Sequence, residues 1–368
     1  MKLGRIVSIN KKILLLILVI FSLSLFSLPT LAADDNETIT LRVQSVYTGP
    51  LYEYDKLVLE RISAITAGRI KFEVFQAGEI VSGGEILDAV SAGIVDAGTD
   101  FCSYWVGKNL AFDILATHTA SGTLMDFLMW YYVGGGKDFY QETYGLYNIV
   151  YLPHYLMGPE SGFRTNVPIN NLEDFKGLKI RTSSYVGGKV LEALGASPAP
   201  LPIAETYEGL QRGVIDGAEF SGPKNDWDQG FQEITKYVCT PSWHQPYGVT
   251  GVLINKDVWQ SLPEDLKPML TGAFEASMNR AAYEQLYMDA EATNKFLEAG
   301  VELCRLSDED LDKIEEIKSK IQEEIASKNE LYARILKSQV DFYKRFANYR
   351  KVIAPYYPSR EIKFFPDL

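Results

Sequence analysis

Residues 85–98, Glu85-Ile-Leu-Asp-Ala-Val-Ser-Ala-Gly93-Ile-Val-Asp96-Ala-Gly98, predict a short helix that ends at a glycine and leads directly into a strand. Gly93 suits the left-handed backbone conformation that commonly ends a helix, and Asp96 suits a tight exit into the next element. About 120 residues later, Glu205-Thr-Tyr-Glu-Gly-Leu-Gln-Arg-Gly213-Val-Ile-Asp216-Gly217 repeats the arrangement. The chain therefore contains two copies of a helix–Gly–strand unit.

The residues before the first copy predict the fold class. A β-rich strand at 38–46, an amphipathic helix at 51–67 that Gly68 ends, and a second strand at 69–75 together form a βαβ unit. Repeated units of this kind predict an α/β fold.

The residues just beyond the two copies are candidates for a binding site. Residues 100–105 and 219–226 are expected at the ends of strands, and ligands of open α/β sheets bind outside the carboxyl ends of strands. Two such copies predict two lobes that face each other across a ligand cleft. Chance repetition of a βα unit is the alternative interpretation.

The first 33 residues are typical of a secretory signal peptide. A basic start is followed by an uncharged apolar run and by small residues before a polar mature start. The alternative is an uncleaved membrane anchor, but the serines, Pro29 and the small-residue site favour cleavage. No cysteine stands at that site, so a lipid anchor is not indicated. We therefore expect an exported, periplasmic protein.

The mature length predicts two lobes, because single hydrophobic cores stop growing at roughly 250–300 residues. We expect lobe I to comprise residues 34–162 and 246–290. Lobe II and a back helix are expected at 163–245 and 291–350, followed by a C-terminal tail at 351–368.

Composition and charge exclude some partners. Hydrophobic residues make up 46 % of the chain, which is ample for packed cores. Without its leader the chain has 32 basic and 48 acidic residues, a balance of −16. Such a charge argues against nucleic acid as a partner. An anionic ligand would need a dedicated cation nearby.

Two further segments have clear helix signals. In residues 168–181, Asn170 or Asn171 is expected to cap a short helix that Gly177 ends, before a strand that includes Arg181. From Ser307 onward, apolar residues recur at spacings of three and four as far as Phe346, which predicts a pair of amphipathic helices. A dimerising role for this C-terminal helical region is an alternative to simple packing on the lobes.

Motifs for catalysis are lacking. The three histidines (His118, His154 and His244) have neither metal-site nor triad spacing, and no Gly-x-Ser-x-Gly or phosphate-binding loop occurs. A hydrolase built on two carboxylates is not excluded by composition. The three cysteines (Cys102, Cys239 and Cys304) are interpreted as buried thiols, although one disulfide is compatible with an oxidising compartment.

Four stretches resemble the solute-binding subunits of tripartite ATP-independent periplasmic (TRAP) transporters, the DctP family, solute-binding protein family 7. They are residues 66–71, 85–98, 171–181 and 205–219, in the family's order along most of the mature chain. The resemblance implies a periplasmic-binding-protein-like fold of two α/β lobes with a long C-terminal helical region. It also implies capture of a small organic acid, no enzymatic activity, and transfer of the ligand to TRAP membrane subunits.

The resemblance also implies the residues that bind the ligand. Arg181, in Gly-Leu-Lys-Ile-Arg, matches the arginine that holds the ligand carboxylate, for which a planar guanidinium offers two parallel donors. Tyr104 resembles an aromatic residue of the first lobe that touches the ligand, with core packing as the alternative. Trp243 is a further candidate. Arg164 is interpreted as either a second basic contact or a structural ion pair.

The branch of the family that binds 2-oxo and 2-hydroxy monocarboxylates is the most similar, and it binds a metal ion with the ligand. Glu219, the Phe220 carbonyl and Gln245 are the ligands that the resemblance implies. Glu160, with Ser161 as its rival, stands where the branch has Gln or Asn, and a second carboxylate would favour a divalent ion. Oxygen ligands suit Ca²⁺ or Na⁺.

Three other functions compete with this one. The same fold could bind a dicarboxylate or sugar acid without metal, and Glu219 would then accept hydroxyl groups. A secreted carboxylate-based hydrolase would turn its substrate over. A subunit that presents ligand to a sensory receptor is not separable from a transport subunit by sequence.

Overall fold

Both copies of the helix–Gly–strand unit form as predicted. The computed structural model describes residues 38–117 and 124–353. Helix α3 (Ile86–Ser91) leads into strand β3 (Ala97–Phe101), and α8 (Thr206–Gln211) leads into β8 (Gly217–Ala218). Gly93 and Gly213 have φ angles of +73° and +67°, so each occupies the left-handed region expected of a helix-ending glycine.

The aspartates of the two units have the same structural role. Asp96 accepts a hydrogen bond from the backbone N–H of Arg42, and Asp216 accepts one from that of Lys179, both at 2.8 Å. Arg42 belongs to β1 (Ile39–Gln44), which pairs in parallel with β3. Lys179 begins β6 (Lys179–Arg181), which pairs in parallel with β8. Each aspartate therefore ties its unit to the neighbouring parallel strand.

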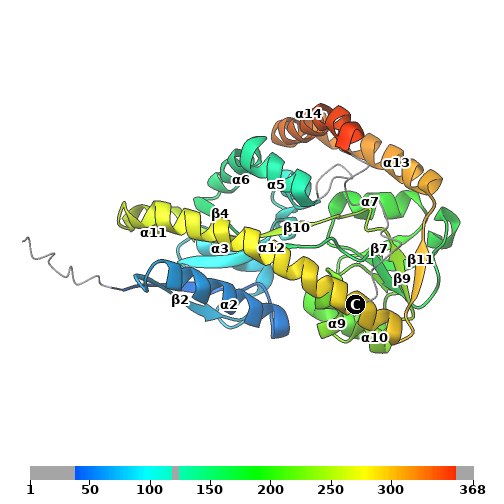
Figure 1. Cartoon of the computed structure of the whole chain (residues 1–368), viewed down its shortest axis with the longest axis horizontal. Helices are drawn as coiled ribbons and strands as arrows, with labels where there is room; N and C mark the ends of the chain where they lie inside the picture. The colour runs from blue at the N-terminus through cyan, green and yellow to red at the C-terminus, as the bar shows by residue number, and fades with distance from the viewer. Residues whose placement is uncertain (1–37, 118–123, 354–368) are drawn as a thin grey trace, which may run out of the picture. The chain divides into compact units, whose positions relative to one another are not determined.

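The described elements form two sheets (Figure 1). The five-stranded sheet has the order β2-β1-β3-β10-β4, in which β10 runs antiparallel to both neighbours. Its other strands are β2 (Ile70–Phe75), β4 (Ile149–Met157) and β10 (Gly248–Asn255). Besides α3, the helices that connect or follow these strands are α2 (Gly49–Ile65), α4 (Ala111–Thr117), α5 (Leu124–Val133), α6 (Gly136–Gly145) and α11 (Lys256–Ser261). We call this sheet and its helices the first half.

The six-stranded sheet has the order β11-β9-β5-β8-β6-β7. Its remaining strands are β5 (Phe163–Thr165), β7 (Ser197–Ala199), β9 (Tyr237–Thr240) and β11 (Glu302–Arg305). The helices between them are α7 (Tyr185–Ala193), α9 (Pro223–Asp228) and α10 (Phe231–Ile234). We call this sheet and its helices the second half. The segments 158–162 and 241–247 connect the two sheets.

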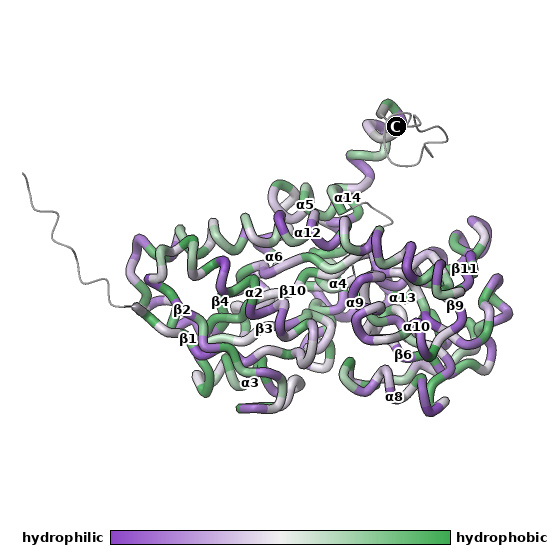
Figure 2. The backbone as a smooth tube through the Cα atoms, turned by 60° about the horizontal axis from the view of Figure 1, so that its bottom comes forward, coloured by the Kyte–Doolittle hydropathy of each residue, from purple (hydrophilic) through white to green (hydrophobic). Residues whose placement is uncertain are grey.

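Three long helices complete the fold. Helix α12 (Leu266–Glu298) contacts α2 and β4 of the first half and α9 of the second. Helix α13 (Asp308–Ala326) packs on α7, and α14 (Glu330–Ile353) packs on α4, α5 and α6. Hydrophilic residues recur along α13, whereas apolar residues recur along β10 (Figure 2). The two-lobed α/β class and the long C-terminal helical region are confirmed.

The sequence pattern located the ends of several elements but missed α12. Asn171 caps the short helix at 172–175, as predicted, and Ser307 caps α13. Helix α12 has no clear apolar stripe because its buried positions include Ser277, Gln285 and Asp289. These polar residues break the spacing on which sequence patterns depend.

Asp113 of α4 connects the two halves. Its carboxylate accepts hydrogen bonds from the backbone N–H groups of Tyr185, at 2.7 Å, and Val186, at 3.4 Å, in the first turn of α7. The side chain is fully buried. Burial raises the pKa of Asp113 to about 6, although these backbone hydrogen bonds oppose the shift.

The chain ends, possible membrane spans and the cysteines were also subjects of prediction. The signal peptide lies outside the described residues, as does most of the C-terminal tail. No helix among the described residues is long and apolar enough to cross a membrane. The three cysteines are free and buried, as the interpretation as small hydrophobes requires.

Gly251→Ala is predicted to destabilise the protein. A Cβ at this position of β10 would lie 2.0 Å from the Tyr151 ring and 2.8 Å from Asp100 Oδ1. Such overpacking costs about 1–3 kcal/mol. Gly272→Ala is the matched control, because an added Cβ there meets no atom within 4 Å and alanine stabilises a helix interior by up to about 1 kcal/mol. Urea unfolding measures both, and equal stabilities would contradict the prediction.

Asp113→Asn is predicted to change how stability depends on pH. Because the folded-state pKa of Asp113 is raised to about 6 from 3.8, the folded protein retains a proton that the unfolded chain releases. The stability of the wild type therefore falls as pH rises through this window, by on the order of 3 kcal/mol at most, relative to the variant. Urea unfolding at about pH 4 and about pH 7 tests this. A stability difference that does not vary with pH would rule it out.

Candidate functional site

The ends of two neighbouring strands carry the predicted site residues. Arg181 is the last residue of β6, and Glu219 follows the end of β8 directly. These strands pair in parallel with Arg181 opposite Ala218, so their carboxyl ends lie side by side. The register therefore brings the arginine and the glutamate together.

Arg181 and Glu219 form a buried ion pair. Arg181 Nη1 lies 3.0 Å from Glu219 Oε1, and the two side chains are 2 % and 1 % exposed. The same nitrogen donates to the Glu219 carbonyl at 2.8 Å, while Nε donates to the Leu201 carbonyl at 3.2 Å. Glu219 also accepts from the backbone N–H of Ser183. Both charges are thus held in place by backbone groups of the second half.

A second buried carboxylate comes from the connecting segments. Glu160, in segment 158–162, accepts a hydrogen bond from Gln245 Nε2, and its other oxygen lies 3.0 Å from His244 Nε2. His244 and Gln245 belong to segment 241–247. Burial raises the pKa of Glu160 to about 7, although the hydrogen bond with His244 opposes the shift.

These groups converge on one point. Among the described residues, Glu160, Glu219 and His244 each offer one ligand atom, and the three atoms lie within 4.8 Å of one another. Gln245 Oε1 and His244 Nδ1 are buried without a hydrogen-bond partner. Buried polar atoms without partners are costly, so the unpaired Gln245 carbonyl oxygen beside two carboxylates is suited to a cation.

Tyr104 of the first half lies within electrostatic reach of the same cluster. Burial raises the pKa of its phenol; the charge of Arg181 opposes this shift, whereas Glu219, Asp100 and Glu160 add to it. Tyr104 lies in the short helix Cys102–Trp105 that follows β3. Asp100 holds this helix by accepting from Trp105 Nε1 at 2.8 Å. The first copy of the repeated unit therefore leads to an aromatic residue within electrostatic reach of the cluster, whereas the second leads to Glu219 itself.

Two other predicted residues pack mainly on aromatic neighbours. The Phe220 ring meets Phe231 edge to face, with ring centroids 5.0 Å apart. The Trp243 ring lies 5.6 Å from Phe163 and 6.3 Å from Phe175. Both side chains are buried. Phe220 adjoins the cluster because it follows Glu219 directly in the sequence, whereas its ring packs on Phe231.

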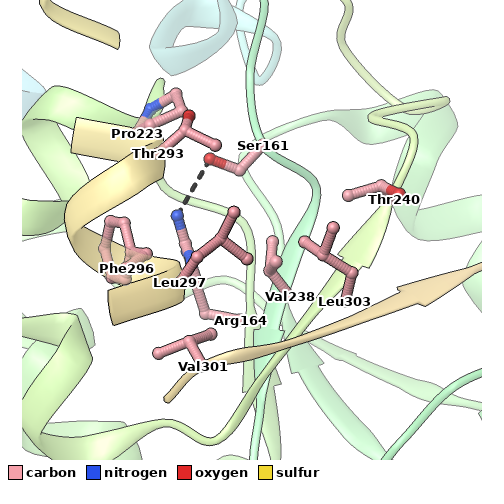
Figure 3. Close-up of a pocket in the computed structure, with 10 residues that line it drawn as sticks. All are labelled: Ser161, Arg164, Pro223, Val238, Thr240, Thr293, Phe296, Leu297, Val301 and Leu303. Carbon is pink, nitrogen blue, oxygen red and sulfur yellow. Dashed lines mark hydrogen bonds between the residues drawn. The ribbon is translucent and has the colours of Figure 1, made fainter. Parts of the chain in front are cut away.

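Arg164 forms a structural ion pair, which is one of the two roles that the sequence allowed for it. Its Nε donates to Asp226 Oδ2 at 2.9 Å, and Nη2 donates to Ser161 Oγ at 3.0 Å. The guanidinium lies 3.8 Å from the Phe296 ring centroid, beside a pocket of about 110 Å³ at the end of α12 (Figure 3). Arg164 Nη1 is buried without a hydrogen-bond partner.

His244 was missed as a member of the cluster by sequence reasoning. The quoted stretch Ser242-Trp243-His244-Gln245 contained it, but one histidine without a partner at ligand spacing gives no metal signal. Its partner Glu160 is 84 residues away in sequence. Only the folded chain brings the two together.

Comparison with known proteins identifies relatives over most of the chain. The family model described as bacterial extracellular solute-binding protein, family 7 (DctP), matches residues 48–329. A monocarboxylate 2-oxoacid-binding periplasmic protein of Nostoc sp. is 31 % identical over 297 residues, which cover 80 % of this chain and 81 % of the relative.

Two solved structures of TRAP periplasmic solute-binding proteins are similar throughout. The protein from Colwellia psychrerythraea, with bound calcium and pyruvate, is 26 % identical with a TM-score of 0.80. The protein from Pseudoalteromonas atlantica, with bound sodium and pyruvate, is 28 % identical with a TM-score of 0.77. Each comparison covers 86 % of this chain and 98 % of the other. The resemblance seen in the sequence is therefore confirmed: the chain belongs to the DctP family of bacterial extracellular solute-binding proteins, family 7.

Proposed function

We propose that this protein binds a small 2-oxo or 2-hydroxy monocarboxylate, together with a metal ion, as the periplasmic solute-binding subunit of a TRAP transporter. The observation that carries the proposal is the buried Arg181–Glu219 pair, with Glu160 converging on it from the connecting segment. The names of the relative from Nostoc and of the two pyruvate-bound structures support the ligand class.

Arg181 would bind the ligand carboxylate. Its guanidinium is always charged, and its backbone contacts on Nε and Nη1 keep the plane fixed. Two parallel N–H groups match two carboxylate oxygens, and burial strengthens that charge-assisted contact. Tyr104 would cover the ligand from the first half, with Trp243 as a further candidate contact.

The residues present fit a cation. The ion would be held by Glu219, the Phe220 carbonyl, Glu160 and Gln245. Gln245 Oε1 is available for this role because it is buried and lacks a hydrogen-bond partner. With both glutamates ionised, the charge of Arg181 leaves the cluster at −1, and a monocarboxylate ligand brings it to −2. A bound cation supplies the positive charge that lets an α-oxygen and a carboxylate oxygen of the ligand be buried together. Buried charges otherwise cost several kcal/mol each.

Ligand capture would be a closure of lobe I on lobe II around the connecting segments. The contacts of Asp113 with the start of α7 link the halves, and α7 begins four residues after Arg181. A ligand that orders the end of β6 would thereby favour the closed form. We infer no turnover: the ligand would be released unchanged to the TRAP membrane subunits.

The division into lobes at 162–163 and 245–246 stays a prediction, as does the homodimer through the C-terminal helical region. Helix α14 packs on α4, α5 and α6, so its contacts favour assigning it to the first lobe. The periplasmic location follows from the family and from the predicted signal peptide.

Arg181→Ala is predicted to weaken pyruvate binding by about 30-fold or more, because truncating one partner of a buried charge pair costs about 2–5 kcal/mol. Arg181→Lys keeps the charge but not the fork of donors, so it should retain partial affinity. Arg212→Ala, whose side chain is 71 % exposed, is the control. Isothermal titration calorimetry measures all three. A folded Arg181→Ala variant with wild-type affinity would refute the assignment of the site.

Chelation is predicted to abolish most of the stabilisation by ligand. A ligand at a hundred times its Kd stabilises the native state by about 2.7 kcal/mol, which a thermal-shift assay detects. After EDTA treatment and dialysis, pyruvate should raise Tm only when a metal salt is restored. An equal shift without metal would keep the contact between Arg181 and the carboxylate but remove the metal ion from the proposal.

A further inference from the structure

His244 changes the chemistry of the cluster from oxygen-only to mixed oxygen and nitrogen. The residue is 4 % exposed, and its ring lies against Phe163 with centroids 4.7 Å apart and planes at 36°. This packing fixes the ring plane. Its Nε2 is 3.0 Å from a Glu160 oxygen. Glu160, Glu219 and His244 each offer one ligand atom, and these atoms lie within 4.8 Å of one another.

The spacing of these atoms suits one small cation. Ligand atoms about 2.1 Å from an ion lie about 3 Å apart when they are at right angles, which is close to the separation of Glu160 Oε2 and His244 Nε2. One ion can therefore contact both atoms by replacing the proton of the hydrogen bond between them. The cluster offers two carboxylates and one imidazole, and an α-oxo or α-hydroxy acid would add two oxygens.

The nitrogen donor discriminates between metal classes. Ca²⁺ and Na⁺ are hard ions that bind oxygen ligands, whereas imidazole suits zinc, copper, iron and nickel. The charge of the cluster favours a divalent ion over Na⁺: two carboxylates, Arg181 and a monocarboxylate sum to −2, which Ca²⁺ or a divalent transition metal ion neutralises. The choice between those two classes therefore depends on the nitrogen donor.

We propose that the site binds a divalent first-row transition metal ion, with His244 as its nitrogen ligand beside Glu160 and Glu219, rather than the calcium or sodium found in the two similar structures. The inference rests on the proposed function in assuming that this cluster is the ligand site. The cargo would then be a transition-metal complex of the organic acid.

The direct test titrates metal-free protein with Co²⁺, Zn²⁺, Mn²⁺, Ca²⁺ and Na⁺, each alone and with pyruvate, by calorimetry. We expect Co²⁺ and Zn²⁺ to bind at least tenfold more tightly than Ca²⁺. The Mn²⁺ complex should show nitrogen coupling from imidazole in pulsed electron paramagnetic resonance. Calcium binding as tightly as cobalt, or a manganese complex without nitrogen coupling, would overturn the proposal.

A variant assigns the nitrogen. His244→Gln should remove the nitrogen coupling and weaken Co²⁺ binding by about 10–100-fold, while Ca²⁺ affinity changes little. His154→Gln is the matched control, because His154 is a fully buried histidine beside Asp55 in the first half. Nitrogen coupling that persists in His244→Gln would disprove the assignment. If that variant does not fold, the wild type can be labelled with ¹⁵N-histidine. A change in the nitrogen coupling of the Mn²⁺ complex then shows that a histidine nitrogen binds the metal.

The two proposals fail in different ways. Pyruvate binding that requires calcium and is not supported by cobalt would support the proposed function and refute the metal assignment. Tight cobalt binding with nitrogen coupling but no binding of any carboxylate would support the metal assignment and refute the proposed function.

Discussion

The Arg181 guanidinium is 2 % exposed and lies 3.0 Å from a Glu219 carboxylate that is 1 % exposed. Neither charge could remain in that position alone, because an unpaired buried ion costs several kcal/mol. Their pairing requires β6 and β8 to lie side by side in parallel with Arg181 opposite Ala218. The pairing of the two buried charges therefore depends on the register of β6 and β8, and a shift of that register would leave both charges unpaired. The rest of the cluster is arranged around this ion pair.

The other members of the cluster depend on the connections between the sheets. Glu160 follows β4 and precedes β5, whereas His244 and Gln245 lie between β9 and β10. Each connecting segment therefore brings one part of a hydrogen-bonded group that neither sheet contains by itself. In a protein that closes around its ligand, such a location is expected to link occupancy of the site with the geometry of the connections.

Buried polar contacts also join separate elements outside the cluster. Asp113 accepts from the first turn of α7, and Asp289 of α12 accepts from the Lys224 backbone N–H at the start of α9. These carboxylates are buried, and burial raises the pKa of each to about 6. These carboxylates face backbone N–H groups rather than cations, so they hold the elements together only when each N–H points at a carboxylate oxygen. Only one arrangement of the elements meets that condition.

Local signals in the sequence determined the fold class, the repeated helix–Gly–strand unit and the position of Arg181 at a strand end. Gly93, Gly213, Asp96 and Asp216 act over a few residues, so their roles follow from local backbone chemistry. The long helix α12 escaped detection because polar residues occupy part of its buried face. The place of His244 beside Glu160 was decided only by the tertiary structure. A contact across 84 residues depends on how two connecting segments pass each other, and no spacing along the chain encodes that.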